Sequence, residues 1–124
     1  MSEEVSLWWR QAVEDLDSAK ANITSGKYYV ASLLAQQAAE KALKALTIKK
    51  LGELFKTHDL VFLAEKLGLP QNLLDLCDSL SKVYLTSRYP DASGEIPADS
   101  FTKADAISDV SNAEEVLEWV KKRM

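Results

Sequence analysis

A histidine and an arginine are the first candidates for acid–base or phosphate chemistry in this 124-residue sequence. His58, in the sequence THDL, is the sole histidine and would be the natural general acid or base near neutral pH. The structural alternative is an imidazole that donates to a neighbouring backbone group. Arg88, in the sequence RYPD, presents a guanidinium that can fork onto a phosphate or a carboxylate. Its structural alternative is a contact with Asp91 or with the end of a helix.

Lysines are concentrated in one stretch of an otherwise acidic chain. Residues 41–56 contain five lysines and one acid, whereas the whole chain has a formal net charge of −4. Lys41 and Lys44 could form the wall of a groove that binds phosphates, helped by the three later lysines. The alternative is a solvated helix face on which Glu40 pairs with Lys44 one turn away. The lysine excess is therefore a hint of an anionic ligand.

Other familiar sites are missing from the sequence. It contains no phosphate-binding glycine loop, no dinucleotide-binding glycine motif, no HExxH, no GxSxG and no CxxC. One cysteine and one histidine are too few for a zinc site, and the lone Cys77 fits the core of a protein in a reducing compartment. We therefore expect no cofactor and no metal, and only the residues above as candidates for chemistry.

Composition predicts one ordinary domain over residues 1–124. The chain is 47% hydrophobic and 27% charged, and one core suffices at this length. Its acidic N-terminus does not resemble a signal peptide, and the most apolar stretch, residues 28–46, is interrupted by glutamines, a glutamate and lysines. These features predict a cytoplasmic protein that does not enter a membrane.

The candidate residues must be positioned by helices, because apolar residues recur every three or four positions. Glycines follow three of the predicted helices, Thr57 is a candidate N-cap, and Thr102 with Asp105 forms a capping box. We predict helices over residues 5–23, 27–51, 58–67, 70–84 and 102–120, with a long connection at 87–101. Short turns favour an all-α, antiparallel up-and-down bundle of four to five helices. Trp8 and Trp9 must diverge, which places one at an interface or under another helix.

Several runs along the chain together resemble the HEPN family, the higher-eukaryote and prokaryote nucleotide-binding domain. The resemblance spans nearly the whole sequence and rests on the runs WWRQA, SGKYY, QQAAEKALKA, THDL, RYPD and EWV, in that order. It implies an all-α bundle, commonly a homodimer, often encoded beside a minimal nucleotidyltransferase as a module of toxin–antitoxin type. The ligand that the resemblance implies is a nucleotide or RNA.

One motif of the family is missing from this sequence. Ribonuclease members carry an arginine followed, after four to six residues, by a histidine. His58 would need that arginine within residues 51–53, which read Leu-Gly-Glu, and Arg88 is followed at 93–95 by Ser-Gly-Glu. The family's ribonuclease activity is therefore not transferred to these positions. A ligand or interaction groove does carry over, loosely, near Lys41, Lys44, His58, Arg88 and Tyr89.

Three functions remain open from the sequence. The first is a non-catalytic module that binds a nucleotide or a nucleotidyltransferase through the Lys41 and Lys44 face and the Arg88 loop. The second is a metal-independent ribonuclease toxin in which folding or a dimer brings His58 and Arg88 together. The third is a purely structural dimer.

Overall fold

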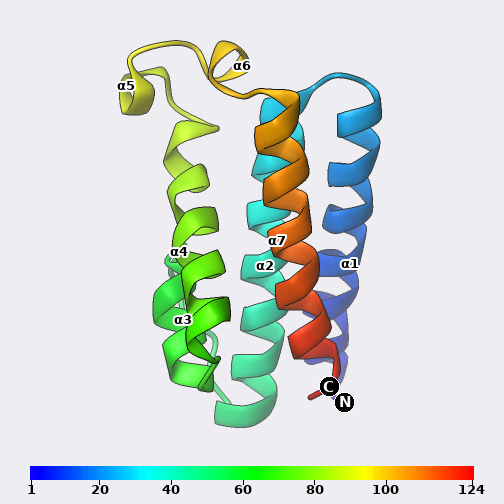
Figure 1. Cartoon of the computed structure of the whole chain (residues 1–124). Helices are drawn as coiled ribbons and strands as arrows, with labels where there is room; N and C mark the ends of the chain where they lie inside the picture. Colours follow the sequence, from blue (N-terminus) through cyan, green and yellow to red (C-terminus); the bar gives the residue numbers. More distant parts are fainter.

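The computed structural model describes residues 1–124, with the side chain of Ser93 left out. Five helices of two turns or more form the body of the molecule, and two one-turn helices lie in the connection that precedes the last of them (Figure 1). In order these are α1 (Glu3–Thr24), α2 (Tyr28–Leu51), α3 (Leu60–Leu67), α4 (Gln71–Thr86), α5 (Pro90–Ser93), α6 (Pro97–Ser100) and α7 (Lys103–Lys121). The predicted all-α bundle is confirmed.

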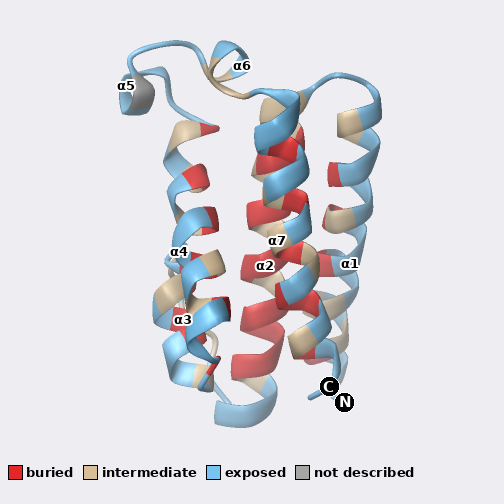
Figure 2. Ribbon diagram, in the orientation of Figure 1, coloured by how far each residue is buried: buried red, intermediate tan, exposed pale blue. Residues whose placement is uncertain are grey.

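The long helices run up and down, with α2 in the centre. Figure 1 shows both chain termini at one end of the bundle, together with the last turn of α2; we call this the terminal end. The opposite end carries the α1–α2 turn, α5 and α6. Helix α2 contacts α1, α7, α3 and α4, and its alanines allow these neighbours to approach closely. Figure 2 shows the resulting concentration of buried residues along α2.

The polar half of α2 is not the solvated face that the sequence allowed. Gln36, Glu40 and Lys44 are all buried, with 0%, 5% and 6% of their surfaces exposed. After Gly52 the chain turns back along α2, which brings His58 to Glu40 before α3 begins, while Trp8 of α1 lies near the ammonium of Lys44. Burial of charged groups on this scale requires that they be paired.

The ends of the helices follow local sequence, with one correction. Gly52 and Gly68 take left-handed conformations (φ 68° and 75°) at the C-caps of α2 and α3, as the pattern predicts. Thr102 and Asp105 form the predicted capping box of α7. Thr57 is not the N-cap of α3: the Asp59 carboxylate accepts from the first free backbone N–H groups instead, and the Thr57 hydroxyl accepts from the Asp59 backbone N–H.

The long connection at residues 87–101 is partly ordered by proline. Helices α5 and α6 each begin at a proline, Pro90 and Pro97, whose fixed φ suits the first helical position. Gly94 ends α5 with φ 80°. This segment lies over the end of the bundle opposite the termini (Figure 1). Among the described residues, no helix combines the length and the apolar character needed to cross a membrane.

Candidate functional site

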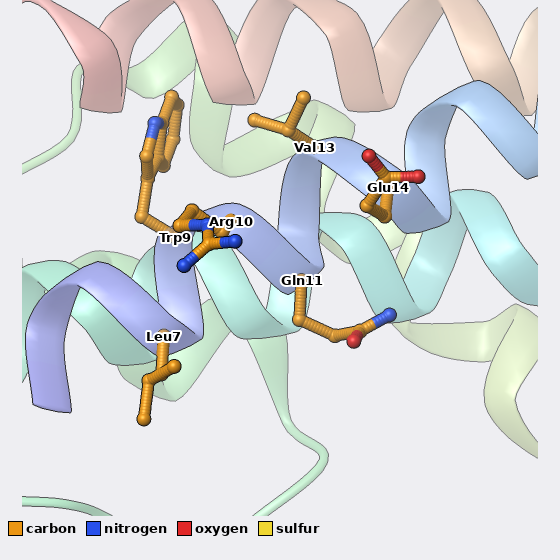
Figure 3. Close-up of a pocket in the computed structure, with 6 residues that line it drawn as sticks. All are labelled: Leu7, Trp9, Arg10, Gln11, Val13 and Glu14. Carbon is orange, nitrogen blue, oxygen red and sulfur yellow. The ribbon is translucent and has the colours of Figure 1, made fainter.

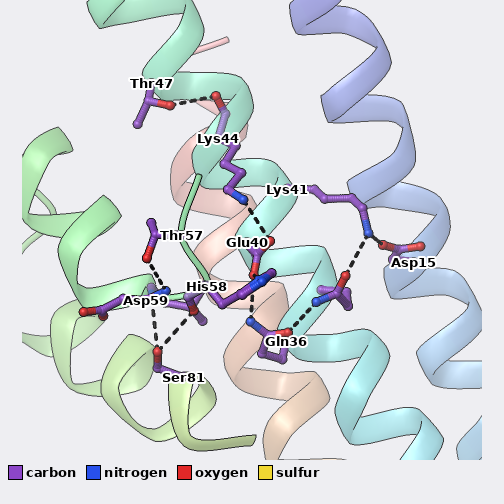
Figure 4. A network of polar contacts seen from close by, with 12 residues as sticks. Asp15, Gln36, Glu40, Lys41, Lys44, Thr47, Thr57, His58, Asp59 and Ser81 are labelled. Carbon is purple, nitrogen blue, oxygen red and sulfur yellow. Dashed lines mark hydrogen bonds and ion pairs between the residues drawn. The ribbon is translucent and has the colours of Figure 1, made fainter. Parts of the chain in front are cut away.

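A buried carboxylate, Glu40, lies at the centre of the polar contacts in the middle of the bundle (Figure 4). Its Oε2 atom accepts from Lys44 Nζ at 3.0 Å, and its Oε1 atom accepts from Gln36 Nε2 at 3.1 Å. Oε1 also lies 2.9 Å from His58 Nδ1. The side chain of Glu40 is 6% exposed, so these partners replace the water that an ionised carboxylate needs.

His58 faces both Glu40 and solvent. Its side chain is 52% exposed, although Nδ1 is held by the buried carboxylate. A carboxylate paired with Lys44 can only accept, so the imidazole donates from Nδ1 and its Nε2 atom is left as the acceptor in the neutral ring. This is the arrangement in which a carboxylate fixes the tautomer and orientation of a general base.

Tyr84 of α4 brings His58 and Arg88 together. The His58 and Tyr84 rings stack with centroids 3.9 Å apart and an interplanar angle of 18°. The guanidinium carbon of Arg88 lies 4.5 Å from the centre of the same Tyr84 ring. An exposed imidazole and an exposed guanidinium are thus held by one aromatic ring, and no described carboxylate pairs with Arg88. We call Glu40, Lys44, His58, Tyr84 and Arg88 the His58 cluster.

Polar contacts continue from this cluster towards α1. Gln37 donates to Gln36, and Lys41 contacts Gln37 Oε1 at 3.3 Å. Lys41 Nζ then pairs with Asp15 Oδ2 of α1 at 2.6 Å. The two carboxylates of this chain of contacts, Asp15 and Glu40, balance the two ammonium groups of Lys41 and Lys44. Neither lysine therefore presents an unpaired charge to an incoming phosphate.

The structure groups the sequence candidates unequally. His58 and Arg88, thirty residues apart, share the Tyr84 ring, and Lys44 reaches His58 through Glu40. Lys41 belongs to the α1 side of the network, whereas Tyr89 is 44% exposed directly after Arg88. The ion pairs of the described residues do not include the candidate contact between Arg88 and Asp91.

Sequence reasoning missed two residues of the cluster. Tyr84 lies in the last turn of α4 and Arg88 follows the end of that helix, so their contact depends on how the chain leaves α4. The role of Glu40 towards His58 was not detectable either, since they are eighteen residues apart and meet only because the chain turns back after α2.

Two shallow hollows lie along α1 beside this network. One, of about 410 Å³, is shown in Figure 3, where Leu7 and Trp9 point in opposite directions from the helix. The other, of about 250 Å³, is lined by Leu7, Trp8, Gln11 and Lys41. Trp9 packs against the core while Trp8 lies 5.8 Å from the Lys44 ammonium, which confirms that the two tryptophans diverge.

Among the described residues, neither Cys77 nor a group of metal-ligating side chains forms a further reactive site. Cys77 is fully buried, as predicted, and burial raises the pKa of its thiol to about 12. The thiol is therefore protonated at neutral pH and is a poor nucleophile. No group of three or more metal-ligating side chains occurs in the part of the chain that the structure describes.

The chain folds as an all-helical bundle in which α2 contacts α1, α7, α3 and α4. The model of the HEPN domain matches residues 5–123, and the chain therefore belongs to the HEPN family. A curated relative from Methanocaldococcus jannaschii, named "Putative toxin MJ1304", is 33% identical over an alignment that covers 93% of this chain and 84% of the relative.

Solved structures agree with this assignment. The crystal structure of TT1696 from Thermus thermophilus superposes with a TM-score of 0.92 at 30% identity, covering 99% of this chain and all of that one. ST0689, described as an archaeal HEPN homologue, gives a TM-score of 0.84 at 34% identity over 99% and 98% of the two chains. A HEPN domain protein from Thermotoga maritima, TM0613, gives 0.73 at 26% identity over 93% and 94%.

Proposed function

We propose that this chain is a cytoplasmic nucleotide-binding and interaction subunit of a toxin–antitoxin-type pair. It acts as a homodimer, and its partner is a minimal nucleotidyltransferase. Membership of the HEPN family and the relative named as a toxin support the type of system. The His58 cluster supports the ligand.

The observation that carries the proposal is the pairing of His58 and Arg88 on Tyr84. The guanidinium of Arg88 is exposed and has no carboxylate partner among the described residues, so its fork is available to phosphate oxygens. His58, whose side chain is 52% exposed, stacks on the same Tyr84 ring, and Tyr89 is an exposed aromatic residue directly after Arg88. Lys44 acts from behind, because it holds Glu40, which orients His58. Lys41 fixes α1 against α2 through Asp15.

Calorimetric titration with a panel of nucleoside mono-, di- and triphosphates tests this proposal. Arg88→Ala should weaken binding of the best ligand at least tenfold, since a charge-assisted bidentate contact is lost. Lys82→Ala is the control: it removes an exposed cation of α4 and should leave affinity unchanged. Equal affinities of Arg88→Ala and the unmodified protein would remove the His58 cluster as the site.

A second function, metal-independent RNA cleavage, is favoured by the Glu40–His58 contact. With Nδ1 held by Glu40, Nε2 of His58 can take the proton of a ribose 2′-hydroxyl as that oxygen attacks the adjacent phosphorus. Arg88 would stabilise the added negative charge. The P–O5′ bond would then break to leave a 2′,3′-cyclic phosphate, and the 5′-oxygen would take a proton from water. The arginine comes from the residues just after α4 and the histidine from the segment before α3, not from the family's local motif.

Cleavage of a labelled single-stranded RNA in EDTA tests this second function. His58→Asn should abolish cleavage, and Arg88→Lys should slow it, because lysine keeps the charge without the fork. Lys82→Ala, which removes an exposed cation of α4, should cleave at the unmodified rate. Absence of cleavage by the unmodified dimer with retained nucleotide binding would leave the binding function alone.

Exposed apolar side chains on α1 support the proposal of a homodimer. Leu7 and Val13 are 56% and 43% exposed there and flank the hollow of Figure 3, an arrangement suited to burial against a second copy. Light scattering should give twice the chain mass of 13.8 kDa, and Leu7→Asp should reduce it to the monomer.

Affinity purification from the native host with mass spectrometry tests the partner: a small nucleotidyltransferase should be recovered.

A further inference from the structure

A second group of cations surrounds a pocket at the terminal end of the bundle. The last turns of α2, α3 and α7 converge there around a pocket of about 290 Å³, lined by Lys50, Lys66, Trp119, Arg123 and three leucines. We call it the terminal pocket. None of its lining residues belongs to the His58 cluster, and it is formed by three helix ends rather than by the middle of α2.

The cations of the terminal pocket are not neutralised by acidic side chains. The ion pairs of the described residues involve Lys20, Lys41, Lys44, His58 and Lys82, all outside this pocket. Lys66 lies instead over the aromatic rings of Phe62 and Phe55, at 5.4 and 6.0 Å. Three exposed positive charges therefore face one pocket in a chain whose net charge is negative.

An aromatic ring and a guanidinium form one wall of the pocket. The guanidinium carbon of Arg123 lies 3.6 Å from the centre of the Trp119 ring. Arg123 Nη1 donates to the Trp119 carbonyl at 2.9 Å, which holds the side chain in place and leaves its other N–H groups available. Planar guanidinium groups and indoles are surfaces on which nucleobases stack.

We propose that the terminal pocket binds a nucleoside phosphate, either free or within a single strand of RNA. Lys50 and Lys66 contact the phosphate, and the Trp119–Arg123 wall contacts the base. The pocket volume of about 290 Å³ is close to the lower end of the range for small-ligand sites. This site is separate from the His58 cluster and does not depend on the function proposed for it.

Fluorescence anisotropy with a fluorescein-labelled oligoadenylate measures the binding of a strand, and calorimetry with AMP and ADP measures the binding of a free nucleotide. The test variant is Lys50→Glu with Arg123→Glu. The matched control, Lys27→Glu with Lys103→Glu, changes the net charge equally but at the opposite end of the bundle (Figure 1). Lys50→Glu alone keeps the Trp119–Arg123 contact and serves if the double variant unfolds.

We expect the double variant to bind at least tenfold more weakly and the control to bind within twofold of the unmodified protein. The salt dependence of oligoadenylate binding should also become shallower, by about 0.7 in the slope of log affinity against log salt for each lost phosphate contact. Arg88→Ala should remove only the nucleotide binding that belongs to the His58 cluster and leave the binding that the double variant loses. The terminal pocket is therefore measured in the Arg88→Ala background, which separates the two sites.

Each result decides between sources or overturns the proposal. Oligoadenylate binding without AMP or ADP binding identifies a strand as the ligand, and the reverse identifies a free nucleotide. If neither probe binds, the proposal is wrong. It is equally wrong if the test and control variants lose affinity to the same extent, because the effect then comes from net charge. Loss of binding in Arg88→Ala alone would assign the ligand to the His58 cluster and leave the terminal pocket without a role.

Discussion

The lysines near the middle of α2 and those at its end have opposite surroundings. Lys41 and Lys44 pair with Asp15 and Glu40, and Lys44 is buried. Lys50, two turns further along, is exposed in a pocket with two more cations and no paired acidic side chain. The five lysines of residues 41–56 are therefore not one anion-binding feature. Their availability to a ligand depends on the carboxylates that the fold brings to them.

Among the substitutions that test this difference between the middle and the end of α2, removal of Glu40 should have the largest effect. Glu40→Ala leaves the buried ammonium of Lys44 without its carboxylate, so we expect a loss of about 3–5 kcal/mol in the free energy of unfolding. Urea unfolding measures it, and Glu53→Ala, which removes an exposed acid of the following segment, should stay within about 0.5 kcal/mol of the unmodified protein. A loss below about 1 kcal/mol in Glu40→Ala would mean that Lys44 reaches water.

Asp109 is the reverse case, a carboxylate to which no described base is paired. Burial is the main reason that the pKa of this carboxyl on α7 is raised from 3.8 to about 6, and nearby Asp105 adds to the effect. The folded state then binds more protons than the unfolded state between about pH 4 and pH 6. Stability consequently falls as the pH rises through this range, and the full penalty is present at neutral pH.

Asp109→Asn should remove that penalty. The difference in pKa corresponds to about 3 kcal/mol, and because the side chain is partly exposed we expect a gain of about 1–2 kcal/mol at pH 8. Urea unfolding at pH 8 and at pH 3.5 checks the sign, because the gain should disappear at the lower pH. An equal effect at both pH values would show that packing, not ionisation, is responsible.

The helices were predictable from the sequence because apolar spacing and glycine positions are local signals. The cap of α3 was not, since Thr57 and Asp59 both suit that position and the path of the preceding segment decides between them. Periodicity also could not show that Glu40 and Lys44 are buried. A helix in the centre of a bundle has no free face, and its polar residues are then paired with one another.

The candidate site was predictable only in its parts. His58 and Arg88 were identified by residue type, because few side chains here could act on phosphate. Their meeting over Tyr84 depends on where α4 packs against the segment before α3, which no local pattern encodes. The charge count of residues 41–56 suggested one groove, whereas the fold separates paired lysines from unpaired ones.

The smallest effect on stability is expected for Lys50, at the end of α2. Lys50→Ala removes an exposed ammonium that the fold does not use, so the free energy of unfolding should change by no more than about 0.5 kcal/mol. Urea unfolding beside Glu40→Ala measures both regions of α2 under the same conditions. A loss of more than about 1 kcal/mol would show that Lys50 has a stabilising partner in the folded state. In that case neither the middle nor the end of α2 would offer a free ammonium, and the distinction between them would disappear.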